Sequence, residues 1–193
     1  MFLKNKQTVR MLTVMAGVMG FGHQAMAATS TLDVTAQAYI EKGTCTFKVD
    51  NQSATSVPFA FNTVTPAEIE AQNKSVEKKI VISDCVGTSG MNISLSSSNK
   101  VKINGDTTHD YLRPANAAVK VAYKTEIKTE GGNYVPLYVG ATPIRLGGNF
   151  EPFGQGKTGN LYIKATLIPA VADIMTIGSG TLDSTATLNM DFL

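Results

Sequence analysis

The sequence has no tryptophan, only two cysteines and only two histidines, and just 17% of its 193 residues are charged. Histidine and cysteine supply many catalytic bases, nucleophiles and zinc ligands, and they act in sets held at defined spacings. His109 is the only histidine after residue 27, and no second histidine lies at ligand spacing from it. No motif pairs the scattered carboxylates either. We therefore expect no enzyme, no catalytic residue, no metal site and no cofactor.

Long hydrophobic runs are also missing, apart from one near the start of the chain. Lys4, Lys6 and Arg10 precede an apolar stretch from Met11 to Gly22, and the small-residue triplet Ala25-Met26-Ala27 follows it. This order is typical of a secretory signal peptide, and the apolar stretch is shorter than the ~20 residues that span a bilayer. We expect residues 1–27 to be a cleaved signal peptide, and the mature chain to be secreted.

Charge of one sign is not in excess. The predicted signal contains three of the 17 basic residues and none of the 15 acidic ones, so its removal changes the net charge from +2 to about −1. Nucleic-acid binding depends mainly on phosphate neutralisation by basic residues. The balance after cleavage therefore gives no support for a nucleic-acid partner.

The two cysteines, Cys45 and Cys85, lie 40 residues apart and show no Cys-x-x-Cys spacing. In a chain bound for an oxidising compartment, the even pairing within one chain is a structural disulfide. Closing a loop of this length stabilises a fold by about 4 kcal/mol in the chain-entropy description. We predict a Cys45–Cys85 bridge.

Short alternating or β-branched segments, separated by Gly, Asn, Pro and Ser, predict an all-β fold. The expected strands are Leu32 to Ile40, Val57 to Phe61, Lys79 to Asp84, Asn92 to Ser96, Ala118 to Lys124, Val135 to Val139, Leu161 to Ile168 and Thr181 to Leu193. A short helix is expected where Thr65, Pro66 and Glu68 form a capping box. Asn104-Gly105 predicts a tight turn, whereas Gly147-Gly148 and Gly154 to Gly159 suggest mobile loops.

Two amphipathic stripes stand out at the ends of the mature chain. One face of the last thirteen residues carries Leu182, Ser184, Ala186, Leu188, Met190 and Phe192. One face of the first strand carries Leu32, Val34, Ala36, Ala38 and Ile40. Both stripes are expected to bury one face. The period leaves two arrangements open: the strands pair within one chain, or the N-terminal strand joins one subunit to the next by strand addition.

The mature chain resembles the type 1 family of chaperone–usher pilins. The resemblance rests on the alternating arm that ends at Gly43-Thr44-Cys45, and on Ile80, Ile82, Asp84 and Cys85 in the pattern Ile-x-Ile-x-Asp-Cys. It also includes Gly180, fourteenth from the end, the Ser184-Thr185-Ala186-Thr187 run, and the penultimate aromatic Phe192. The glycine-to-aromatic spacing is the most specific of these features.

The resemblance implies an incomplete immunoglobulin-like Greek-key β-sandwich, the pilin fold, which a donated strand completes. It divides the chain into a signal peptide (1–27), a donor-strand extension (28–41) and a pilin domain (42–193). A periplasmic chaperone would lend a strand to the open groove. At an outer-membrane usher, the arm of the neighbouring pilin subunit would then replace it.

Mapped onto this chain, the resemblance assigns the donated side chains to Leu32, Val34, Ala36, Ala38 and Ile40. It assigns the groove and chaperone-binding strand to Gly180, Leu182, Ser184, Ala186, Leu188, Met190 and Phe192. The family usually has glycine in the middle of the arm, where this chain has Ala38. An alanine there implies a slightly roomier pocket.

The function implied by the resemblance is a structural subunit of a surface fimbria that polymerises by donor-strand exchange and supports adhesion. The alternative is a single-domain tip adhesin or invasin that binds a host-cell receptor through its own loops. The arm discriminates between the two, because a subunit at the distal tip has no neighbour to which it donates a strand. The Leu32 to Ile40 stripe favours the internal position.

Overall fold

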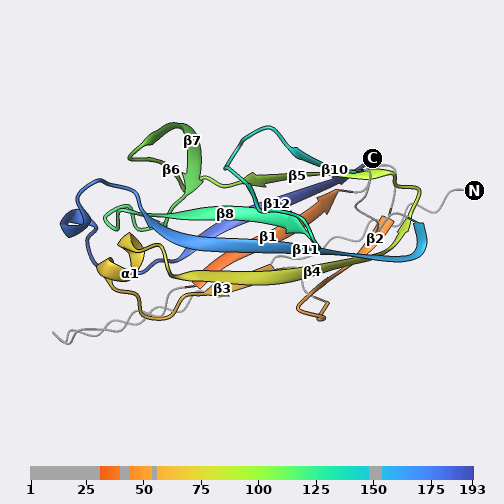
Figure 1. Ribbon diagram of the computed structural model, residues 1–193, viewed down its shortest axis with the longest axis horizontal. Coiled ribbons are helices and arrows are strands. Elements are labelled where there is room, and N and C mark those ends of the chain that lie inside the picture. The colour runs from red at the N-terminus through yellow and green to blue at the C-terminus, as the bar shows by residue number, and fades with distance from the viewer. Residues whose placement is uncertain (1–30, 40–43, 54–55, 148–153) are drawn as a thin grey trace, which may run out of the picture.

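The strands of the molecule form two sheets that face one another, as the computed structural model shows (Figure 1). It describes residues 31–39, 44–53, 56–147 and 154–193. The first sheet has the order β10 (Ile144–Gly147), β5 (Gly90–Ser96), β12 (Ser184–Phe192), β1 (Thr31–Tyr39), β3 (Ser56–Ala60). The second has the order β2 (Thr44–Val49), β4 (Ser75–Val86), β11 (Gly154–Pro169), β8 (Val121–Thr129), β7 (Asp106–Leu112), β6 (Lys100–Ile103), and β9 (Val135–Pro136) also pairs with β8.

The all-β prediction is confirmed, and each of the eight predicted strands overlaps an observed one. The boundaries differ most at β11, which begins at Gly154 and not at Leu161, and at β8, which ends at Thr129 and not at Lys124. Strands β2, β6, β7 and β10 were not predicted. These strands are short or polar, so their period-2 pattern is weak, and their pairing partners fix them.

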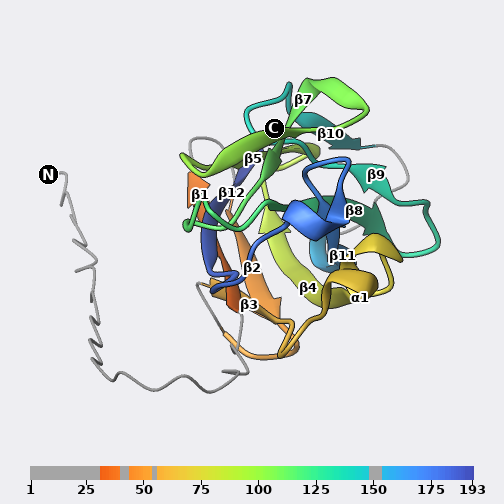
Figure 2. The same cartoon turned by 90° about the vertical axis from the view of Figure 1, so that its left-hand side faces the viewer.

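The core lies between the two sheets. Figure 2 views the sandwich from the end where α1 (Pro66–Glu70) lies, with β1, β12 and β3 on one side and β4, β11 and β8 on the other. Alternate residues of the central strands are almost fully inaccessible, and these are Val57, Phe59, Ile80, Ile82, Met91, Ile93, Leu95, Leu161, Ile163 and Leu188. Because side chains alternate along a strand, each strand contributes one apolar face to this core.

The predicted disulfide is present. Cys45 of β2 and Cys85 of β4 are bonded, with their Cα atoms 4.1 Å apart. The two strands are adjacent and antiparallel, and the bridge lies where their register shifts between Thr44 and Thr46. It therefore fastens the beginning of β2 to the end of β4 covalently.

One loop prediction is wrong. Gly154 to Gly159, expected to be a loop, forms the first part of strand β11. Gly154 pairs with Cys85 and Thr158 pairs with Ser83, so three residues of β11 lie opposite Asp84 in a bulge. Glycine is common at bulges because it tolerates the local kink. Pairing with β4 overrides the low strand propensity of the segment. Of the other predicted loop, Gly147 ends β10, and Gly148 lies outside the described residues.

The predicted capping box of the short helix is confirmed. The Thr65 hydroxyl accepts a hydrogen bond from the Glu68 backbone N–H at 3.3 Å, and the Glu68 carboxylate accepts one from the Thr65 backbone N–H at 2.8 Å. Lys74 approaches the same carboxylate at 2.8 Å. The Lys74 ammonium first, and then the two Thr65 groups, lower the pKa of Glu68 to about 2. The cap positions Ile69, which is buried in the core.

We expect Thr65→Ala to lower the free energy of unfolding by about 1 kcal/mol, because the cap loses its side-chain acceptor. Thr65→Ser is the matched control, since it keeps the hydroxyl and should retain most of the stability. Urea denaturation of the three proteins measures the difference. Equal stability of the alanine and serine variants would contradict a stabilising role for the cap.

Glu68 should also make stability depend on pH. Its pKa falls from an ordinary 4.5 to about 2 on folding, so the ionised form stabilises the native state. The stabilisation is complete above pH 4.5 and is lost as the pH falls through 2. We expect the difference in unfolding free energy between the wild type and Glu68→Gln to shrink across this window. A difference that stays constant from pH 6 to pH 2 would contradict the assignment.

Candidate functional site: the strand-binding groove

Strand β1 lies between β12 and β3 (Figures 1 and 2). It runs parallel to β12, with Val34 opposite Ala186 and Ala38 opposite Met190. It runs antiparallel to β3, with Leu32 opposite Phe59. The groove is defined here as the space between β12 and β3, and within the chain its occupant is the N-terminal arm. Of the predicted arm residues, Leu32, Val34, Ala36 and Ala38 belong to β1, and Ile40 lies outside the described residues.

The predicted stripe of the C-terminal strand faces the core. Its members are at most 7% exposed, and they are Leu182, Ser184, Ala186, Leu188, Met190 and Phe192. The register places the apolar positions of the arm beside this stripe: 32 pairs with 184, 34 with 186, 36 with 188 and 38 with 190. The two stripes seen in the sequence thus become neighbours in one sheet.

The opposite wall of the groove is formed by β3, which the sequence predicted as a strand but not as part of the site. Val57 and Phe59 are fully buried, and their positions pair with Val34 and Leu32 of the arm. Their alternation with exposed Ser56, Pro58 and Ala60 was the available signal. That signal reveals a buried face but not which strand lies beside it.

A recess of about 200 Å³ opens at the beginning of β12, beside α1 and the short 3-10 helix η1 (Ile174–Thr176). Its apolar lining includes Val64, Ile69, Val119, Ile177 and Leu182. The predicted residue Gly180 belongs to this lining, which contains no residue of β1, β3 or β12.

Gly180 has a structural reason to be glycine. Its φ is +151°, and a Cβ atom there would lie 2.7 Å from Asn116 Nδ2 and 3.0 Å from Val119 Cγ2. Both the backbone conformation and the lack of space disfavour a side chain. Gly180 therefore lets the chain pass close to the 116–119 segment immediately before it enters β12.

The end of the chain is fastened on several sides. β5 pairs with β12 on the edge opposite β1, and the Leu193 carbonyl accepts a hydrogen bond from the Ser89 N–H at 2.7 Å. The Phe192 ring lies 5.7 Å from the Phe47 ring of β2. These contacts place β2 next to the C-terminal end of β12.

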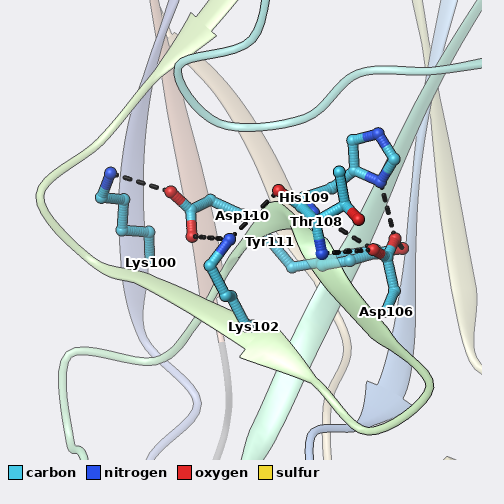
Figure 3. Close-up of polar contacts among 7 residues, drawn as sticks. All are labelled: Lys100, Lys102, Asp106, Thr108, His109, Asp110 and Tyr111. Atoms are coloured by element: carbon cyan, nitrogen blue, oxygen red, sulfur yellow. Dashed lines mark hydrogen bonds and ion pairs between the residues drawn. The ribbon is translucent and has the colours of Figure 1, made fainter.

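A polar cluster lies on the hairpin of β6 and β7, joined at the predicted Asn104-Gly105 turn (Figure 3). His109 belongs to β7. Its Nδ1 lies 2.8 Å from Asp106 Oδ2, and its ring stacks on Tyr138 at 3.9 Å. The Tyr111 hydroxyl donates to the same carboxylate oxygen at 2.9 Å.

Both carboxylates of the cluster, Asp106 and Asp110, are paired with neighbouring donors or cations. The His109 side chain, followed by weaker donors, lowers the pKa of Asp106 below its ordinary value. Lys100 at 2.9 Å and Lys102 at 3.6 Å both pair with Asp110, and Lys100 contributes most to the lowered pKa of that carboxyl. The cluster thus stabilises the hairpin. Among the described residues, no three His, Cys, Asp or Glu side chains gather in a way that could hold a metal ion.

Comparison with known proteins finds no matching protein-family model and no significant match among curated proteins. In the part of the chain that the structure describes, no helix has the length and apolar character needed to cross a membrane.

We expect Gly180→Ala to destabilise the fold by more than about 1 kcal/mol, because an added methyl group meets both a strained backbone and two neighbouring atoms. Gly140→Ala is the matched control: its φ is also positive, at +70°, but no atom lies within 4 Å of the added Cβ. Thermal unfolding of both variants separates steric from conformational cost. Equal losses in the two would show that the contacts at Gly180 contribute nothing.

Proposed function

We propose that the chain is a structural subunit of a bacterial surface fibre, assembled by strand donation in the manner of chaperone–usher pilins. The observation that carries the proposal is the position of β1. This terminal strand fills a groove between two strands, β12 and β3, that do not pair with each other. In the sequence it precedes the rest of the fold and is joined to it through only four residues, 40–43. A strand with these properties is well suited to exchange between subunits.

The energetics of the groove support the same function. Removal of β1 leaves the backbone donors and acceptors of β12 and β3 unpaired along one edge, and an open edge with apolar neighbours promotes aggregation. The groove stripe includes Leu188, Met190 and Phe192, and burial of each such side chain contributes about 1.5–3 kcal/mol. A subunit with an open groove therefore needs a partner strand, first from a periplasmic chaperone and then from a neighbouring subunit.

The proposed architecture is an immunoglobulin-like pilin sandwich of residues 42–193, with residues 28–41 as the donated extension. The order β5, β12, β1, β3 supports it, because the arm occupies the position that a donated strand would take. The proposed route is secretion through the periplasm, assembly at an outer-membrane usher, and display at the cell surface in a fimbria. No catalytic step belongs to this function.

A tip adhesin is the second candidate. The β6–β7 hairpin projects from the sandwich (Figure 1). A recess of about 460 Å³ lies between this hairpin and residues 138–142, and its lining includes His109, Tyr138 and Thr142. This recess lies away from β12 and β3, so a host-cell receptor can reach it without competing with a donated strand. The arm still favours an internal subunit, because a distal subunit donates no strand.

The test is co-expression with a periplasmic pilus chaperone and usher, comparing the full chain with one that lacks Ala28 to Glu41. We expect the full chain to form fibres and the truncated chain to stop as a soluble one-to-one complex with the chaperone. Electron microscopy and gel filtration measure the two outcomes. If the truncated chain folds alone as a stable monomer without a chaperone, the groove does not need a donated strand and the fibre function is rejected. Normal display of the truncated chain at fibre tips would instead favour the adhesin.

A further inference from the structure

We infer that the recess beside the β6–β7 hairpin is a binding site for a neutral saccharide. One wall of this recess is strand β7 over residues 108–110, and the other is the segment 138–142. Neither wall includes a residue of β1, β3 or β12. The inference therefore goes beyond the proposed function, and it applies to the subunit wherever it lies in a fibre.

Aromatic rings at the recess offer a surface for the apolar face of a sugar. The His109 and Tyr138 rings lie nearly parallel, with 12° between their planes and 3.9 Å between their centroids. Tyr111 meets the Tyr138 ring at 79°, with the centroids 5.3 Å apart. The His109 side chain is still 41% exposed, so a ligand in the recess can reach it. An aromatic ring packs well against the C–H groups on one face of a pyranose.

The rest of the lining supplies hydrogen-bonding groups for sugar hydroxyls. Thr108 and Thr142 are exposed lining residues, and each hydroxyl is both a donor and an acceptor. The Asp110 carboxylate is approached by Lys100 at 2.9 Å and by Lys102 at 3.6 Å. Because a carboxylate has about four acceptor positions, this pairing leaves positions for the donating hydroxyls of a saccharide.

The charges beside the recess favour a neutral ligand. Apart from the histidine, the charged side chains drawn in Figure 3 are Asp106, Asp110, Lys100 and Lys102, two of each sign. These charges cancel, so the cluster gives no net attraction for a polyanion or a polycation. An apolar ligand is disfavoured too, because among the described residues that line the recess only Val139 has an aliphatic side chain larger than alanine. A neutral molecule with both hydroxyls and C–H faces meets these conditions, and a saccharide is such a molecule.

The two walls are held in place within the free protein. The Asp106 carboxylate accepts hydrogen bonds from the backbone N–H groups of Thr108 and His109, at 3.0 and 3.1 Å. The Val139 N–H donates to the Asp110 carbonyl at 2.9 Å, which joins one wall to the other. A site whose walls are already ordered loses less conformational freedom when it binds a ligand. Binding should therefore need no rearrangement of the hairpin.

The first test uses saturation-transfer NMR on the mature protein, with the methyl glycosides of glucose, galactose, mannose and N-acetylglucosamine as probes. The ligand signals are observed, so monomers, chaperone complexes and fibres can all be measured. We expect transfer to at least one probe, with a dissociation constant of the order of millimolar, because the ligand is small and the recess is open. No transfer to any of these probes would overturn the inference.

Two valine variants then locate the site. Thr108→Val removes a lining hydroxyl but keeps the shape of the side chain, and it should weaken binding about fivefold or more. Thr107→Val is the matched control, because this residue is also exposed on β7 but points to the opposite face and does not line the recess. Equal binding by the two variants would overturn the inference.

The second test concerns the aromatic surface and compares two substitutions of His109. His109→Phe keeps a ring that can stack on Tyr138, whereas His109→Ala removes it. We expect the phenylalanine variant to keep most of the binding and the alanine variant to lose about fivefold or more. Equal binding by both would overturn the inference. Fibre formation is scored separately: a protein that binds a glycoside but forms no fibres rejects the proposed function alone, and fibres that bind none of the probes reject only this inference.

Discussion

The backbone pairing of β1 with β12 is the interaction on which the first sheet depends. β12 has β5 on one edge and β1 on the other, and β3 is linked to β12 only through β1. Without this strand, the sheet separates into a β10–β5–β12 part and an isolated β3. Unpaired strand edges are costly and prone to association, so the first sheet stays whole only when a strand occupies this position.

Several contacts hold β12 in place beside β1. Gly180 allows the close passage that brings the chain into β12, and Ser89 and Gly90 fasten the final residue at the other end. The Ser184 hydroxyl, buried at the start of the strand, donates to the Arg113 carbonyl at 2.6 Å. The stripe from Ala186 to Phe192 then packs on the opposite sheet. The last strand, which would fray at an ordinary terminus, is in this way a rigid wall of the groove.

The disulfide has a role beyond stabilising a long loop. It fastens the beginning of β2 to the end of β4, and in the sequence β2 follows β1 after only four residues. The strand that follows β1 is therefore anchored covalently in the other sheet.

Much of this organisation could be predicted from the sequence alone. The period-2 stripes of residues 32–40 and 182–192, the capping box at Thr65 and the lone cysteine pair each report a local rule, so the all-β class, the short helix, the disulfide and the buried face of β12 were all predictable. Only the tertiary structure decided which strands lie side by side. Alternation shows that a face is buried but not what covers it. Contacts between residues distant in the chain therefore decided the pairing of β1 with both β12 and β3 and the part played by Val57 and Phe59. They also decided the conversion of Gly154 to Gly159 into a bulged strand and the packing of His109 on Tyr138.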